Sequence, residues 1–277
     1  MPGKAINAVV PAAAGAAATR RDGARRRAAV SVTVIVAFGV VWYVLTALTG
    51  IISPGRFPAP VDVWQAMKQI ALPPGYSGGT LAHHVLQSCR LVLLGFAAAT
   101  SSGVALGLLM GMSRRAEALI NPVFLLLRPI PPLGWIPLAI LWLGLGDSAK
   151  IFVIWVAAVV PSVINTYTGV RNLDPTLVEA ARVMGARGMR MLFDLTLPGA
   201  LPMIFTGLRL SLQVSWTTLV AAELVGALAG LGKVLSSAAL DINPGMIFFA
   251  MCLVSLLGWA MTRALEWVER RVLSWQA

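Results

Sequence analysis

The chain has 277 residues, of which 58% are hydrophobic and only 12% are charged, and its mean hydropathy is +0.80. These values exclude an ordinary soluble domain, which covers its surface with more polar side chains. The formal net charge is +11. Because basic residues of a membrane protein collect on the cytoplasmic side, we interpret this charge as a sign of topology rather than of nucleic-acid binding.

An arginine-rich tail, residues 1–27, precedes the first long apolar stretch. We expect this tail to be cytoplasmic and disordered, or to lie on the inner leaflet, because it offers no apolar pattern to bury. Residues 28–50 are long enough to cross the membrane, starting inside. A cleaved signal peptide is the alternative, but its apolar region would be about 7 to 15 residues, and no clear cleavage site follows.

Residues 51–80 are rich in proline and glycine and are predicted to lie outside, as a periplasmic segment. A short amphipathic helix fits residues 61–70, with Trp64 at the depth of the headgroups. A second span follows at 81–112. It carries small residues at every fourth position, namely Gly95, Ala99, Gly103, Gly107 and Gly111. Such a ridge lets another helix approach closely, either from the same chain or from a second copy.

The third predicted span, residues 119–143, contains Pro129, Pro131, Pro132 and Pro137. These prolines remove backbone donors and obstruct a regular helix. Irregular backbone at membrane depth is tolerated where protein or a water-filled cavity covers it, so this segment is a candidate for lining a pathway. The alternative is a kinked helix that serves only packing.

Three further spans are predicted at 151–170, 203–227 and 246–264, with an outer loop near residues 230–244. The predicted fold is therefore an all-α polytopic membrane protein, with about six spans and both termini inside. Most lysines and arginines then fall on the inner side, as the energetics of insertion requires. A transmembrane domain would occupy residues 28–277.

A polar island, residues 171–202, lies between two of these spans. Asp174 and Pro175 indicate a helix start, and Gly185 a helix end in the left-handed conformation. A second short helix fits 186–195, stopped by Pro198. Exposed methionine and phenylalanine among arginines would suit a docking surface.

The island resembles the EAA loop of bacterial ABC importer permeases, since Glu179-Ala180-Ala181, Gly185 and Leu195-Thr196-Leu197-Pro198 follow the loop's spacing. The resemblance implies a type I importer (MetI-like) fold and a coupling helix that docks into a groove of a separate ATP-binding subunit. The coupling residues it implies are Glu179, Ala180, Ala181, Gly185, Ala186, Arg187, Met189, Arg190, Phe193 and Pro198.

Three other stretches, 128–138, 142–146 and 216–224, resemble permeases for taurine, alkanesulfonates and nitrate, and those for taurine most. This resemblance implies import of taurine or a related organosulfonate, delivered by a periplasmic binding protein. It also implies a second permease copy, most simply a homodimer, in contact with membrane lipid. Alkanesulfonates, nitrate or another small anion are the alternative substrates.

No ATP site is predicted in this chain. Residues 226–233 resemble a phosphate-binding loop, but the spacing is wrong, Val234 replaces the required Ser or Thr, and no strand precedes it. ATP and magnesium are thus expected in the partner subunit, with no cofactor bound here. Cys89 and Cys252 are interpreted as packing residues, and no metal-binding or catalytic constellation is evident.

Charged and aromatic residues inside or near the spans are candidates for the translocation path, because ionised groups there are costly unless paired or wetted. We predict Arg128, Pro131, Trp135, Trp216 and Glu223 for this role. The alternative is a structural ion pair of Glu223 with Arg128 or Arg209. A secondary transporter with Glu223 in an ion relay, and a membrane-embedded enzyme, are the rival classes of protein.

Overall fold

In the computed structural model, the described residues are 30, 33–34, 36–49 and 57–274. They divide between Val63 and Trp64 into two compact units. In the first unit, Val36–Leu48 is a short apolar helix that ends in the π-helical turn η1 (Val44–Leu48), and the indole of Trp42 donates to the carbonyl of Pro58 at 2.9 Å. The predicted span 28–50 lies partly outside the described residues, and the predicted tail 1–27 lies wholly outside them.

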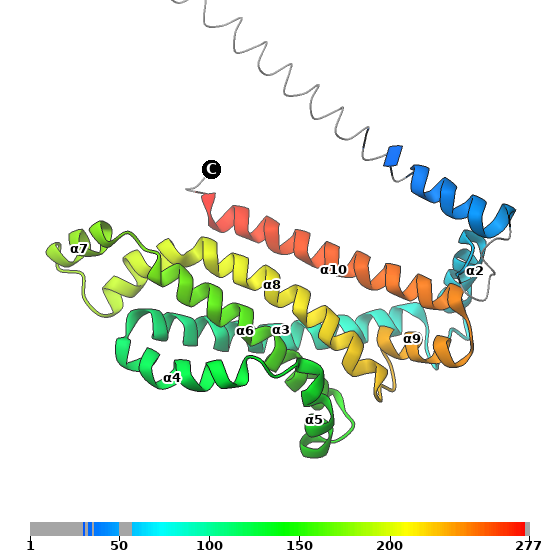
Figure 1. The fold of residues 1–277 in the computed structure, drawn as a ribbon, viewed down its shortest axis with the longest axis horizontal. Helices are drawn as coiled ribbons and strands as arrows, with labels where there is room; N and C mark the ends of the chain where they lie inside the picture. The colour runs from blue at the N-terminus through cyan, green and yellow to red at the C-terminus, as the bar shows by residue number, and fades with distance from the viewer. Residues whose placement is uncertain (1–29, 31–32, 35, 50–56, 275–277) are drawn as a thin grey trace, which may run out of the picture. The chain divides into compact units, whose positions relative to one another are not determined.

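The second unit is helical throughout its described part, and four of its helices are long and apolar enough to cross a membrane. They are α3 (Leu81–Met112), α6 (Asp147–Arg171), α8 (Leu197–Leu224) and α10 (Pro244–Val272). Each coincides with a predicted span, which confirms an all-α polytopic membrane fold. In Figure 1, α10 runs along α8, while α3, α6 and α8 lie together.

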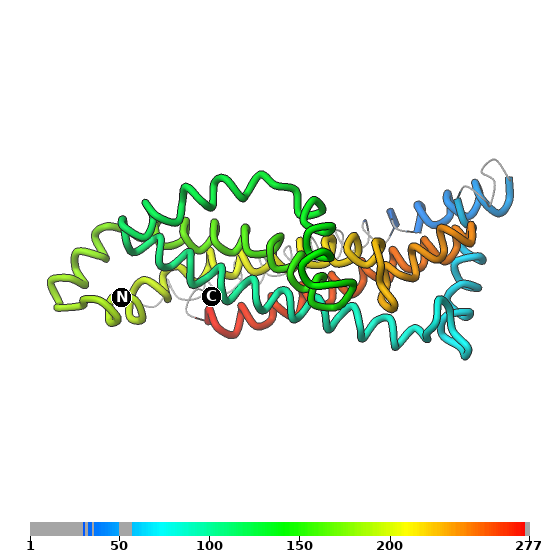
Figure 2. Tube along the Cα trace, turned by 90° about the horizontal axis from the view of Figure 1, so that it is seen from below, coloured from blue at the N-terminus to red at the C-terminus, as the bar shows by residue number. Residues whose placement is uncertain are grey.

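The predicted third span is bent rather than straight. Helix α4 (Arg114–Leu127) and the pair η2 (Pro132–Trp135) and α5 (Ile136–Leu143) meet at an angle of 87°. Figure 2 shows this turn at the side of the unit. Pro129 and Pro131 lie at the break, as their missing backbone donors require. Counted as one span, the pair raises the number of spans in the described residues to five.

The small-residue ridge of α3 packs against α6 of the same chain. A Cβ atom added at Gly95 would lie 2.5 Å from the side chain of Ile154, and one at Gly107 would lie 2.6 Å from Cβ of Thr166. Gly103 and Gly111 meet α6 in the same way. The backbones can approach this closely because the ridge carries no bulky side chains. The helix that packs on the ridge therefore belongs to the same chain.

Two local predictions were wrong. The outer loop near 230–244 contains a helix, α9 (Leu231–Leu240), whose apolar face packs with Ile70 of α2 (Pro60–Ala71). The helix proposed for 186–195 is instead a π-helical turn, η3 (Met191–Thr196), that runs directly into α8. Pro198 does not stop it, because the helix continues from the π-helical turn through the proline into α8.

Candidate functional site

The predicted coupling segment forms helix α7 (Pro175–Val183) at the end of the unit where α3 finishes and α8 begins. The side chain of Asp174 accepts the backbone N–H of Thr176 at 2.8 Å, which caps the first turn. Gly185 has φ +88°, and its N–H donates to Arg182 while that of Ala186 donates to Ala181. These two bonds are the Schellman arrangement, so the predicted start and end of α7 are confirmed.

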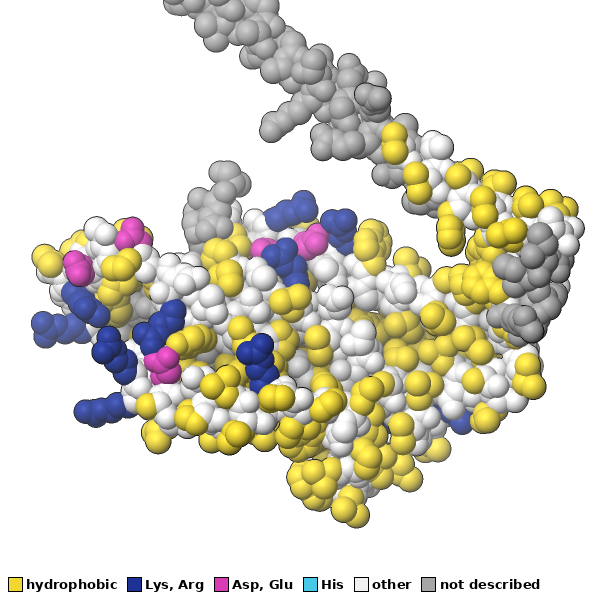
Figure 3. Space-filling model, in the orientation of Figure 1, with side chains coloured by type: hydrophobic (Ala, Val, Ile, Leu, Met, Phe, Trp, Pro, Cys, Tyr) yellow, Lys and Arg dark blue, Asp and Glu magenta, His cyan; other side chains and the backbone are white. Residues whose placement is uncertain are grey.

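Most of the predicted coupling residues are open to solvent. Glu179, Ala180, Gly185, Arg187, Met189, Arg190 and Phe193 are exposed, and Ala181, Ala186 and Pro198 are half-buried. Val183 and Met184 at the tip are 89% and 87% exposed. Figure 3 shows basic side chains gathered over the same end. An exposed apolar tip bordered by arginines is suited to contact another protein.

A groove of about 330 Å³ separates α7 from the ends of α3 and α6. Glu179 and Arg182 of α7 line it together with Arg171. Arg171 also pairs with Glu117 of α4, and Tyr167 donates to the same carboxylate. These charged contacts join α4 and α6 beside the groove, while the tip of α7 is exposed.

The predicted path residues fall in two places. Arg128 and Pro131 are exposed on the connection between α4 and η2, and Trp135 follows at the end of η2. The ring of Trp135 meets Phe152 edge-on, in an apolar cluster with α5 and α6. Trp216 belongs to a different cluster, on the side of α8 that faces α10. The structure thus does not gather these residues around one cavity.

Glu223 is fully buried and accepts hydrogen bonds from two other segments. Ser88 of α3 donates to it at 2.9 Å, and the N–H of Gly232 in α9 at 2.7 Å. The N–H of Leu231 in turn donates to the Ser88 hydroxyl at 2.9 Å. The alternative of an ion pair with Arg128 or Arg209 is wrong, because Arg128 is exposed on the chain's surface and Arg209 pairs with Glu269.

Further polar contacts join the same end of the helices. The N–H of Gly230 donates to Nδ1 of the buried His84 at 3.1 Å, so His84 caps the loop that precedes α9. Tyr76 donates to Asp241, beyond the end of α9, at 2.5 Å. Partial burial and this carboxylate raise the pKa of Tyr76, so the phenol stays protonated and keeps donating.

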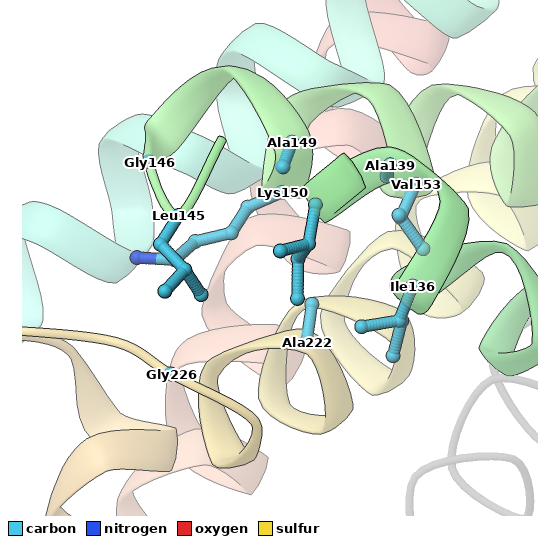
Figure 4. A pocket seen from close by; sticks show the side chains of 10 residues that line it. Ile136, Ala139, Leu145, Gly146, Ala149, Lys150, Val153, Ala222 and Gly226 are labelled. Carbon is cyan, nitrogen blue, oxygen red and sulfur yellow. The ribbon is translucent and has the colours of Figure 1, made fainter. Parts of the chain in front are cut away.

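A small cavity lies between α5, α6 and α8 (Figure 4). Lys150 is the only charged residue among those that line it. The side chain extends past Leu145, and the residue is only 9% exposed. Its ammonium group lies 3.6 Å from Asp147. The remaining wall is apolar, and the volume of about 20 Å³ leaves room for little more than water.

Comparison with known proteins identifies the family. Residues 103–274 match the binding-protein-dependent transport system inner membrane components. The chain belongs to this family. It is therefore a multi-pass membrane permease of the ABC transporter type, the membrane component rather than a catalytic subunit. The matched residues include α7, its glycine cap and the α8–α10 pair.

The permease is similar to the taurine transport system permease protein TauC of Escherichia coli, with 33% identity over 90% of each chain. It is equally similar to the nitrate import permease protein NrtB of Synechocystis, with 33% identity over 89% of this chain and 88% of that one. The fold matches the MetNI methionine ABC transporter in an inward-facing conformation, with a TM-score of 0.63 and 21% identity. That match covers 69% of this chain and 95% of that one.

Sequence reasoning singled out Glu223 of the permease but missed Ser88 and the N-terminal turn of α9. Ser88 and His84 are four residues apart on α3 and so share one face, which is the signal that could have linked them to a buried acid. The geometry gives Glu223 a structural task, because its carboxylate joins α3, α8 and α9.

We expect Glu223→Ala to lower the free energy of unfolding by about 3 kcal/mol, because Ser88 and Gly232 lose their acceptor in a buried site. Thermal unfolding of the purified permease in detergent measures this. Glu266→Ala is the matched control, since it removes only surface pairs with Arg263 and Arg270. Equal losses in the two variants would contradict the assigned role.

Proposed function

We propose that this chain is the permease subunit of an ABC importer that translocates taurine or a related organosulfonate. Membership of the family carries the first part of this proposal, and the 33% identity with a taurine permease supports the second. A periplasmic binding protein would deliver the substrate. A second copy of the permease would complete the path, with both copies embedded in membrane lipid and no nucleic acid involved.

The exposed tip of α7 is the proposed docking surface for an ATP-binding subunit. That subunit would bind ATP and magnesium, so this chain needs no cofactor of its own. Hydrogen bonds cap both ends of α7, so this short helix would move as a rigid unit when the docked subunit moves. Closure of the ATP-binding subunits would move α7, and the base of α7 would pass the movement to α6 and α8.

The proposed path runs between the two copies, with Arg128, Pro131, Trp135, Trp216 and Glu223 as its candidate residues. Of these, Trp216 has the best support, because it lies in the wall of a groove of about 640 Å³ between α8 and α10. Full burial makes Glu223 the weakest candidate. A permease site need not be selective when a binding protein has already chosen the substrate.

Binding measurements on the cognate periplasmic protein would test the substrate. We expect tight binding of taurine, weaker binding of longer alkanesulfonates and little binding of nitrate. The equal identity with a nitrate permease makes nitrate the serious alternative. Tight nitrate binding without taurine binding would reject the proposed substrate.

The mode of energy supply is tested separately, in proteoliposomes that contain the permease, its ATP-binding subunit and the binding protein. Uptake should require ATP inside and continue when ion gradients are collapsed. Uptake that follows a gradient and ignores ATP would instead indicate a secondary transporter.

A further inference from the structure

A polar row on α8 faces the groove between α8 and α10. Arg209, Gln213 and Thr217 are spaced four residues apart, which places them on one face of the helix. Trp216 lies beside them, and Trp259 of α10 forms part of the opposite wall. The groove, of about 640 Å³, is in the size range of sites for small molecules. Its remaining wall is largely apolar.

This face is unsuited to lipid. A guanidinium and a carboxamide exposed to hydrocarbon are costly, and such groups within spans usually face a protein interior or a water-filled cavity. Gln213 is exposed, and its backbone carbonyl accepts from Thr217, whereas its side-chain carboxamide makes no hydrogen bond within the described residues. We therefore expect water or a polar ligand in this groove when the permease is in the membrane.

The groove offers donors rather than acceptors. The Nε1–H of Trp216 has no partner within the described residues, although the residue is only 4% exposed. The hydroxyls of Thr217, Ser255 and Thr262 donate to carbonyl groups of their own helices. Because the indole nitrogen is itself buried, the protons left for a ligand come from the guanidinium and the carboxamide of α8, which suit an anionic group.

The carboxylate of Glu269 would compete with a bound anionic group for Arg209. Glu269 of α10 lies 3.4 Å from the Arg209 guanidinium, which is 37% exposed, so the pair lies at the edge of the groove. A partly exposed pair of this kind is weak and can be exchanged for another anion. The second contact of Arg209, to the hydroxyl of Thr206 at 3.3 Å, lies on its own helix.

We propose that the groove between α8 and α10 binds the sulfonate group of the transported substrate. Arg209 supplies the charge, Gln213 donates a hydrogen bond to an anionic oxygen, and Trp259 covers the short apolar body of the ligand. Glu269 occupies Arg209 when the site is empty. This inference rests on the proposed function as a permease for taurine or a related organosulfonate.

Labelling of a Thr217→Cys variant tests the charge in the groove. The assay uses the complete complex with its ATP-binding subunit, in phosphatidylcholine nanodiscs, with Cys89 and Cys252 replaced by alanine. Rates are compared for two methanethiosulfonates, one carrying an ethanesulfonate and one a trimethylammonium group. Position 217 is about 12 Å along the helix from Arg209. At this distance and an effective dielectric constant of about 20, one charge changes the rate of each reagent about tenfold in opposite directions, and so changes the anion-to-cation rate ratio about a hundredfold.

We expect Arg209→Gln to lower this ratio about a hundredfold and Arg115→Gln, the matched control on exposed surface, to leave it unchanged. Taurine should protect the thiol from labelling, and Arg209→Gln should raise the taurine concentration that gives half-maximal protection. Glu269→Gln should lower it, because Arg209 is then free. Unchanged ratios, unchanged protection, or a thiol that reacts with neither reagent would each overturn the proposal.

The anion could also be a lipid headgroup, which carries the same chemistry. Protection by added phosphatidylglycerol, without protection by taurine, would identify lipid as the ligand and overturn the proposal. ATP-driven uptake with the binding protein is measured on the same preparations. Normal taurine uptake with unaffected labelling rejects this inference alone, whereas absence of ATP-driven uptake of any small anion rejects the proposed function.

Discussion

Gly185→Arg and Glu179→Lys are expected to abolish ATP hydrolysis coupled to transport, while both proteins still insert into the membrane. Gly185 has φ +88°, a conformation that costs other residues about 1 to 2 kcal/mol, so arginine would unwind the end of α7. Glu179→Lys reverses the charge of an exposed side chain that lines the groove beside α7, in the segment that would meet the ATP-binding subunit. A reversed charge at an interface costs several kcal/mol, enough for a loss of about a hundredfold.

Two milder variants are the matched controls. Gly185→Asn keeps the left-handed turn, since asparagine tolerates it and the space around Gly185 is open. Glu179→Gln removes the charge without reversing it. ATPase activity stimulated by the loaded binding protein should fall least in these two variants. Normal stimulation of Gly185→Arg and Glu179→Lys would reject α7 as the coupling helix.

Gly107→Leu is expected to be the most damaging change within the bundle. A Cβ atom alone at this position would lie 2.6 Å from Cβ of Thr166 and 2.9 Å from the carbonyl oxygen of Val163. Leucine would push α3 and α6 apart along the whole ridge, because backbone on the α6 side cannot move aside locally. The loss should be about 3 kcal/mol or more, beyond the usual range for an overpacked core.

The unfolding temperature of the purified permease and its yield in the membrane fraction measure this effect. Ala105→Leu is the control, because it adds the same side chain two residues away on the exposed face of α3. A permease that tolerates both leucines equally would show that the ridge does not determine helix packing.

The sequence by itself determined the membrane class, the four long helices and the two ends of α7. Length and hydropathy of a run, a capping Asp174 and a left-handed Gly185 act within a few residues, so they can be interpreted without knowing the fold. Proline also indicated the break after α4, but not the angle of 87°, which depends on what the two pieces pack against.

Only the tertiary structure decided which helices meet and which polar groups pair. The groups that donate hydrogen bonds to Glu223 belong to residues that are 135 and nine positions away in the sequence. Arg209 pairs with Glu269 of another helix rather than with Glu223. The physical reason is that a buried polar group accepts whichever donor packing brings within about 3 Å, and packing joins segments that are distant in sequence. For the same reason the groove between α8 and α10 could not be predicted from either helix alone.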